Sequence, residues 1–125
     1  MTKTIAAIIG ISVILAALGQ VLLKAGMSAR SVQAAAQSGT PAQFVIAIAT
    51  SWLVWVGLVV FGVSVLTWLV VLSKVEVSTA YPFAALGMVL TATLGYLAFG
   101  ESMGAAKIAG IALICTGVIL VARGA

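Results

Sequence analysis

Four apolar stretches, separated by short polar breaks, dominate this chain and constrain its fold more than any other feature. They cover residues 4–27, 52–73, 78–99 and 104–122. A helix needs about 20 apolar residues to cross the hydrocarbon core of a bilayer, so each stretch predicts one span. Of all residues 64% are hydrophobic and 6% are charged, whereas soluble domains carry about 25% charged residues. We therefore predict an all-α integral membrane protein, a four-transmembrane-helix bundle that forms a single domain over residues 1–125.

The breaks between the stretches differ in character. Residues 30–40 are polar and alanine-rich, while residues 74–78 and 100–104 are typical of tight turns, so consecutive spans should run antiparallel. Thr40 and Pro41 resemble a helix N-cap followed by proline at the first helical position, but the apolar segment 41–50 is too short to span. We interpret it as an extra helix at the membrane surface. The alternative is that the second span begins early and tilts.

The positive charges do not indicate an orientation. In a four-span arrangement the six cations divide evenly between the two sides, with Lys3, Lys74 and Arg123 on one and Lys24, Arg30 and Lys107 on the other. Membrane topology normally follows an excess of Lys and Arg on the cytoplasmic side. The balance has two interpretations: copies inserted both ways, forming an antiparallel pair, or one orientation set by a partner. The net charge of +4 contains no basic run that would indicate nucleic-acid binding.

Gly110 and Gly117 lie seven residues apart in the last span, nearly two helical turns, and so share one face. Positions without side chains allow two helices to approach closely in lipid, where packing drives association. We predict that this face is a dimer contact, either with a second copy or with a related subunit.

Gln20 and Lys24 are polar residues four positions apart on one face of the first span. Polar groups inside a membrane are costly and mark functional candidates. As substrate-binding residues, Gln20 would form hydrogen bonds with a head group and Lys24 would attract a lipid phosphate. The alternatives are a hydrogen bond between helices for Gln20, and a Lys24 side chain that extends to the membrane interface.

The third span begins with Tyr81 and Pro82. Proline inside a helix removes one hydrogen-bond donor, so Pro82 is a candidate hinge. Tyr81 is a candidate substrate contact, with an interfacial tyrosine as the alternative. Trp68 shares a face of the second span with Ser64, and both are further candidate contacts. We expect Tyr81 and the two polar residues of the first span to converge on one cavity between the first and third spans.

The remaining reactive side chains favour structural interpretations. Glu101 directly precedes the last span, where a carboxylate favours the positive end of the helix dipole, so we interpret it as a structural cap, with proton coupling as the alternative. The chain has no histidine, and its single Cys115 lies in an apolar stretch as a packing residue, so we expect neither a metal nor another cofactor. No nucleophile, base and orienting residue form a set, so we expect a transporter and not an enzyme.

Three motifs carry a resemblance to known transporters: Ala80-Tyr-Pro82, Gly100-Glu101 and Gly110-x6-Gly117-Val118. Together they resemble the drug/metabolite transporter superfamily, in particular its small four-helix members, the EamA-like and small multidrug resistance proteins. The resemblance implies a multi-pass protein of the bacterial inner membrane. In small multidrug resistance proteins the matching last helix joins two antiparallel copies, so the resemblance also implies a dimer.

One departure from that pattern concerns the substrate. The small multidrug resistance exporters carry a glutamate inside their first helix, whereas residues 14–20 contain no carboxylate here. The tract 68–82 is more similar to the aminoarabinose–undecaprenyl phosphate flippase subunits, which translocate a sugar carried on a polyprenyl phosphate. The expected substrate is therefore an anionic lipid-linked sugar of that type. A drug or metabolite exporter, and a membrane assembly subunit that transports nothing, are the alternatives.

Overall fold

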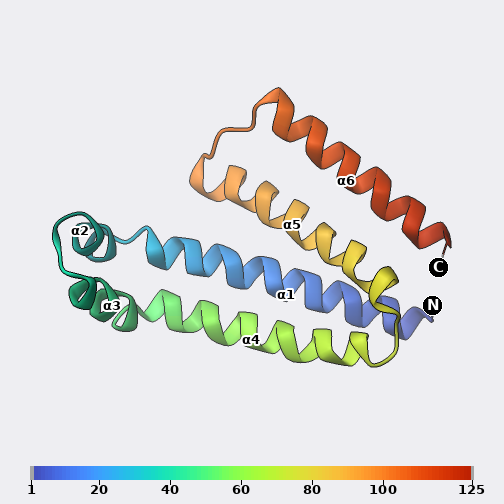
Figure 1. Ribbon diagram of the computed structural model, residues 1–125, viewed down its shortest axis with the longest axis horizontal. Helices are drawn as coiled ribbons and strands as arrows, with labels where there is room; N and C mark the ends of the chain where they lie inside the picture. Colours follow the sequence, from blue (N-terminus) through green and yellow to red (C-terminus); the bar gives the residue numbers. More distant parts are fainter. Residues whose placement is uncertain (1, 125) are drawn as a thin grey trace.

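The computed structural model describes residues 2–124, which form six helices (Figure 1). They are α1 (Lys3–Met27), α2 (Arg30–Ser38), α3 (Pro41–Ala49), α4 (Trp52–Leu72), α5 (Val77–Phe99) and α6 (Ala105–Gly124). Four of them, α1, α4, α5 and α6, are long and apolar enough to cross a membrane. The predicted four-helix membrane architecture is confirmed.

The long helices lie side by side in the order α4, α1, α5, α6 (Figure 1). The most extensive contact joins α1 to α4, α5 packs against α1, and α6 packs against α5 at the edge of the assembly. Both chain ends lie at one end of the bundle and α2 and α3 at the other (Figure 1). Consequently α1 and α5 run in the same direction, which determines the depth at which their residues lie.

Glycines allow the close approach of α1 and α4. A Cβ added at Gly57 of α4 would lie 2.9 Å from the backbone nitrogen of Leu23, and one added at Gly19 of α1 would lie 3.0 Å from the backbone nitrogen of Phe61. Gly26, seven residues after Gly19, packs against α4 in the same way. Such small residues let helices pack closely in lipid, where no hydrophobic force drives them together. The α1–α4 pair is therefore the most extensively packed part of the bundle.

The segment 30–40, expected to be a polar break, contains the helix α2. Two contacts hold it in place. The Val32 side chain is fully buried, and the Gln33 side-chain amide donates to the carbonyl oxygen of Met27 at 2.7 Å, near the end of α1. Because these contacts come from the folded arrangement, the polar composition of the segment did not reveal the helix.

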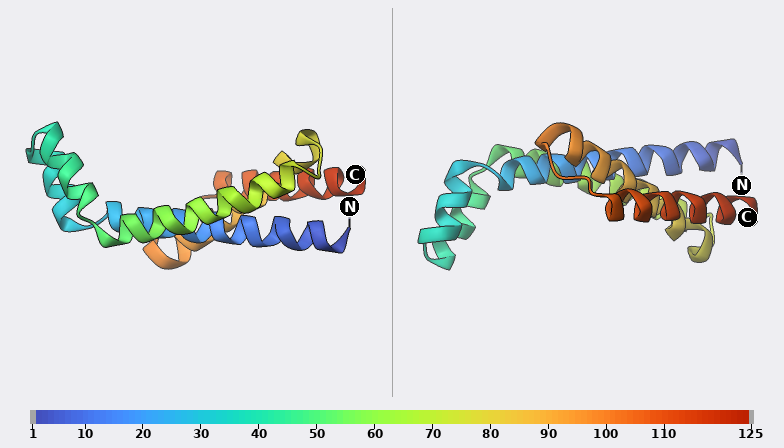
Figure 2. Two further views of the ribbon diagram at one scale, coloured as in Figure 1. Left: turned by 90° about the horizontal axis from the view of Figure 1, so that it is seen from below. Right: turned by 90° about the horizontal axis from the view of Figure 1, so that it is seen from above.

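The short helix α3 begins as its sequence predicts. The Thr40 hydroxyl accepts from the backbone N–H of Gln43 at 3.3 Å, and the Gln43 side chain accepts from the backbone N–H of Thr40 at 3.2 Å, a reciprocal capping box. Residues 50–51 separate α3 from α4, so the second span does not begin early. The α2–α3 pair turns away from the direction of the long helices (Figure 2). Its location at a membrane surface stays a prediction.

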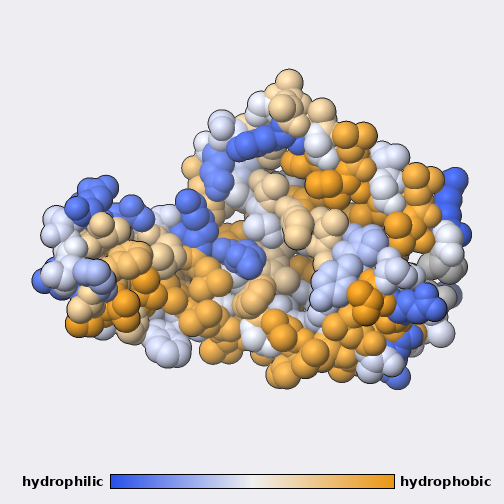
Figure 3. Space-filling view, in the orientation of Figure 1, coloured by the Kyte–Doolittle hydropathy of each residue, from blue (hydrophilic) through white to orange (hydrophobic). Residues whose placement is uncertain are grey.

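Hydrophobic residues cover most of the visible face of the long helices, and hydrophilic residues gather toward the two ends (Figure 3). This distribution suits a protein surrounded by lipid hydrocarbon. The predicted division of the six cations between the ends agrees with the helix directions in Figure 1. The orientation of the protein, and insertion in both orientations, stay predictions.

Candidate functional site

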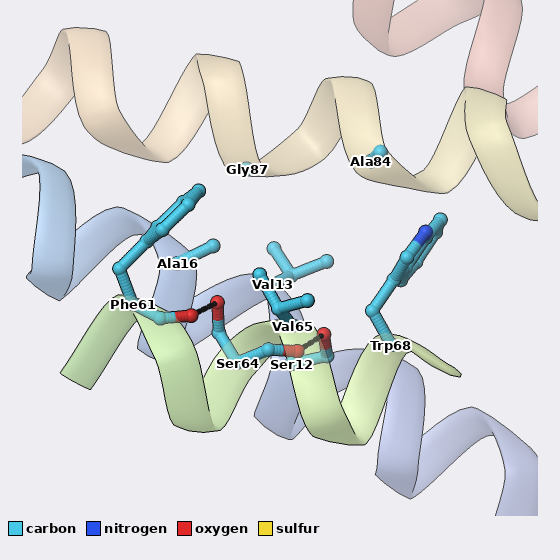
Figure 4. Close-up of a pocket in the computed structure, with 9 residues that line it drawn as sticks. All are labelled: Ser12, Val13, Ala16, Phe61, Ser64, Val65, Trp68, Ala84 and Gly87. Atoms are coloured by element: carbon cyan, nitrogen blue, oxygen red, sulfur yellow. Dashed lines mark hydrogen bonds between the residues drawn. The ribbon is translucent and has the colours of Figure 1, made fainter. Parts of the chain in front are cut away.

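A cavity of about 180 Å³ lies where α1, α4 and α5 meet (Figure 4). Its lining comprises Ser12, Val13, Ala16, Phe61, Ser64, Val65, Trp68, Ala84 and Gly87. Phe61 and Trp68 are seven residues apart, so their rings rise from one face of α4 and stand at the two ends of the cavity (Figure 4). On the α5 side the small residues Ala84 and Gly87 leave the space between the rings open.

Both serines in this lining donate their hydroxyl protons to backbone carbonyl oxygens of α4. Ser12 donates to the backbone carbonyl oxygen of Ser64 at 3.0 Å, which joins α1 to α4. Ser64 donates to the carbonyl oxygen of Phe61 at 2.6 Å, within α4. Both hydroxyls are thus bonded to backbone carbonyl oxygens of α4 (Figure 4). The lining therefore presents an almost entirely apolar surface.

A second, wider cavity of about 420 Å³ adjoins the first and shares Ala16, Phe61, Ala84 and Gly87 with it. It adds Gln20, Met88, Thr91 and Ala92. We refer to the two cavities together as the groove. The Thr91 hydroxyl donates to the carbonyl oxygen of Gly87 at 2.8 Å, whereas no hydrogen bond joins the Gln20 amide to another residue within 2–124. Gln20 is thus the polar side chain that a ligand in the groove would meet.

The predicted convergence of Gln20, Lys24 and Tyr81 on one cavity does not occur. Gln20 lines the wide cavity, but Lys24 is exposed one turn further along α1, and neither Lys24 nor Tyr81 lines the groove. The helix directions explain this arrangement. Because α1 and α5 run in the same direction, Gln20 late in α1 and Tyr81 early in α5 lie at different depths. Tyr81 precedes Thr91, a neighbour of Gln20 in the wide cavity, by ten residues, about 15 Å along a helix.

Tyr81 instead packs against Trp68. The two rings meet edge to face, with centroids 5.8 Å apart and planes at 90°. This geometry is a favourable one for aromatic pairs. The Tyr81 side chain, 55% exposed, therefore supports the ring that ends the groove, and its effect on a ligand there would be exerted through Trp68.

The Glu101 carboxylate lies against α5, and its role as a cap of α6 stays a prediction. The backbone of Gly100, with φ +63°, ends α5, and the Glu101 carboxylate then folds back onto that helix. An added Cβ at Gly95 would lie 3.0 Å from Oε1 of Glu101. Among the hydrogen bonds of the described residues, none joins Glu101 to the first turn of α6. Glycine without a side chain at position 95 leaves room for the carboxylate, which explains its direction.

The glycine face of α6 is open. Nothing lies within 4 Å of a Cβ added at Gly110 or at Gly117. The helix contacts the bundle through α5, and its buried side chain is Val118. The predicted dimer contact is therefore accessible, and it stays a prediction.

Sequence reasoning missed Phe61, which belongs to both parts of the groove. Its signal was present, because Phe61 and Trp68 have the same seven-residue spacing that drew attention to the α6 glycines. An aromatic residue in an apolar span does not stand out by composition, whereas a polar one does. As a result the sequence identified the polar end of the groove and not its apolar walls.

Comparison with known proteins identifies the family. A model of the EamA-like transporter family matches residues 40–123, from the cap of α3 into the last turn of α6. A protein of Pseudomonas aeruginosa named "Probable 4-amino-4-deoxy-L-arabinose-phosphoundecaprenol flippase subunit ArnE" is 39% identical over 71 residues, which are 57% of this chain and 62% of that protein. A Pseudomonas fluorescens protein of the same name is 33% identical over 85 residues, or 68% of this chain and 74% of that protein.

The chain thus spans 62% of the length of the Pseudomonas aeruginosa relative. No solved structure matches it. Four helices suited to crossing a membrane, together with transporter relatives in bacteria, indicate a multi-pass protein of the bacterial inner membrane. The resemblance seen in the sequence is confirmed by a family match over two thirds of the chain, and the chain belongs to the EamA-like transporter family.

Proposed function

We propose that the protein carries an anionic lipid-linked sugar, of the polyprenyl-phosphate type, across the inner membrane. The observation that carries this proposal is the composition of the groove. It is apolar along most of its length, it contains no carboxylate, and it has one neutral amide, Gln20, near the end where Lys24 lies. Relatives named as flippase subunits for such a lipid support it.

The charges favour an anion over a cation. A cation carried through the bilayer centre needs a buried counter-charge, because an unpaired charge there costs at least about 2.5–3.5 kcal/mol. Glu76 precedes α5 and Glu101 follows it, so neither acid lies within a span. Lys24 can meet a phosphate near the membrane surface, and Gln20 can then form hydrogen bonds deeper in the membrane. The substrate's tail stays in apolar surroundings throughout, so only its head needs a polar route.

The other predicted residues have defined places in this proposal. Ser64 and Trp68 line the apolar part of the groove, and Tyr81 holds the Trp68 ring. Pro82 lies inside α5, close to that aromatic pair. Because proline leaves an upstream carbonyl without its helical donor, we assign Pro82 as the hinge about which α5 moves when the groove opens.

Assembly through α6 completes the proposal. Gly110 and Gly117 form an open face on the edge helix, where a second copy or a related subunit can approach closely. The word "subunit" in the names of the relatives is consistent with either arrangement. An inverted pair of copies would reproduce the inverted repeats of many transporters.

The test compares substitutions at one end of the bundle. Binding of a short-chain polyprenyl phosphate to the purified protein should weaken about tenfold for Lys24→Ala, the value of a hydrogen bond to a charged group. Glu101→Gln should change it far less. Lys107→Ala is the matched control, because the Lys107 ammonium donates to the carbonyl oxygen of Ser102 at 3.0 Å and lies outside the groove. Equal losses for Lys24→Ala and Lys107→Ala would contradict a specific role for Lys24.

A further inference from the structure

We infer that the apolar part of the groove, between Phe61 and Trp68, holds a segment of the substrate's hydrocarbon chain inside the protein while the head lies beside Gln20. The identity of the head rests on the proposed function. The place of the chain rests on the shape and chemistry of the lining, which are independent of it.

The walls suit a chain that passes lengthwise. Phe61 and Trp68 are seven residues apart, about 10 Å along α4, and their rings both point toward α5 (Figure 4). Val13 and Val65 lie between them, and Gly87 leaves the α5 side open, since a Cβ there would already be in van der Waals contact with Val13, at 3.5 Å. A second helix is too wide for this space, because an α-helix with its side chains measures about 10–12 Å across.

The same lining excludes a sugar. A hydroxyl transferred from water to an apolar site without a hydrogen-bond partner costs about 1–3 kcal/mol on protein scales. Ser12 and Ser64 have already donated their protons to the α4 backbone. A sugar with several hydroxyls would therefore be strongly disfavoured between the two rings. A hydrocarbon chain has no hydrogen bonds to give up and carries no such cost. While the chain occupies the space between the two rings, the head therefore lies at the Gln20 end of the groove.

The choice of lipid follows from the energetics of a membrane. A chain that moves from bilayer to groove gains little hydrophobic free energy, because both surroundings are apolar. Acyl chains of ordinary phospholipids therefore compete with the substrate on similar terms. The discriminating interaction is charge complementarity at the other end, where Lys24 lies one turn beyond Gln20 and can meet a phosphate. The occupant of the groove is thus the chain of a phosphate-bearing lipid.

Trp68 provides the probe. In a Trp52→Phe, Trp55→Phe background, Trp68 is the remaining tryptophan, and bromine atoms on a nearby lipid chain quench its fluorescence. The protein is reconstituted in vesicles with brominated polyprenyl phosphate, brominated polyprenol or brominated phosphatidylcholine. We expect the phosphate lipid to reach half-maximal quenching at about tenfold lower mole fraction than the alcohol, matching one charged contact. Equal quenching by all three lipids would overturn the inference, because bulk lipid would then explain it.

Two leucine substitutions test the position of the chain. Gly87→Leu fills the groove and should abolish the preference for the phosphate lipid, whereas Gly62→Leu, on a part of α4 where nothing lies within 4 Å, should retain it. A preference retained in Gly87→Leu overturns the inference even if the protein flips lipid-linked sugars. Selective quenching without flipping contradicts the proposed function and leaves the groove assignment standing. If Gly87→Leu fails to fold, the comparison of the three lipids in the Trp52→Phe, Trp55→Phe background, without the leucine, is decisive.

Discussion

The Ser12 hydroxyl donates to the backbone carbonyl oxygen of Ser64 at 3.0 Å, a hydrogen bond that crosses from α1 to α4 in the interior of the bundle. Ser12 and Ser64 are 3% and 2% exposed. The same carbonyl also accepts from the Thr67 hydroxyl at 2.8 Å. This bond fixes the register of α1 against α4 beneath the groove. The residues that form the floor of the groove therefore also belong to the most extensive helix contact of the bundle.

Replacing Ser12 with alanine should destabilise the protein only slightly. The carbonyl oxygen of Ser64 keeps the bond from Thr67, so no buried acceptor is left without a partner. Side-chain hydrogen bonds between membrane helices average about 0.6 kcal/mol, and we expect a loss of that size in the free energy of unfolding in mixed detergent. A loss above about 2 kcal/mol, the range for an unsatisfied buried group, would show that Thr67 does not compensate.

Two glycines of α4 should respond oppositely to the same change. Gly57→Ala places a Cβ 2.9 Å from the backbone nitrogen of Leu23, which must force α1 and α4 apart and cost about 1–3 kcal/mol of stability. Gly62→Ala meets nothing within 4 Å and should be neutral or stabilising by up to about 1 kcal/mol, because alanine favours a helix interior. Thermal unfolding of both variants provides the measurement. Equal stability of the Gly57→Ala and Gly62→Ala variants would mean that α1 and α4 are not closely packed.

The proposed assembly predicts that Gly117→Leu shifts the protein toward monomer, because a bulky side chain separates backbones that must approach closely. Ala112 is the matched control. It is also exposed on α6, and at 100° per residue it lies on the opposite flank of the helix. Crosslinking in membranes would show a smaller dimer fraction for Gly117→Leu than for Ala112→Leu. The same dimer fraction in both variants would exclude this face as the contact.

Hydropathy made the four spans predictable, because the length and apolarity of a membrane helix are local properties of the sequence. The start of α3 was predictable for the same reason, since its capping box involves only Thr40 and Gln43. The helix α2 was not, because its place depends on the burial of Val32 and on the contact of Gln33 with the end of α1. These contacts exist only once the chain has folded.

The site was predictable in part. Gln20 lines the groove as a polar residue in a span was expected to do, and Trp68 and Ser64 lie in the lining. Convergence of Gln20 and Tyr81 was a wrong expectation, because parallel first and third spans place the end of one and the start of the other at different depths. The hydrogen bond from the Ser64 hydroxyl to the Phe61 carbonyl and the contact of Glu101 with Gly95 depend on side-chain conformations that residue spacing does not determine.

The selectivity of transport for head-group charge tests the central claim most directly. The protein is reconstituted in vesicles with a fluorescent polyprenyl-phosphate-linked sugar and with a lipid of the same chain that carries a quaternary ammonium head. The account predicts faster movement of the phosphate lipid between leaflets than in protein-free vesicles, with the ammonium lipid unaffected. Movement of the ammonium lipid alone, together with binding of that lipid that weakens as the pH falls because protons compete for the same site, would contradict it.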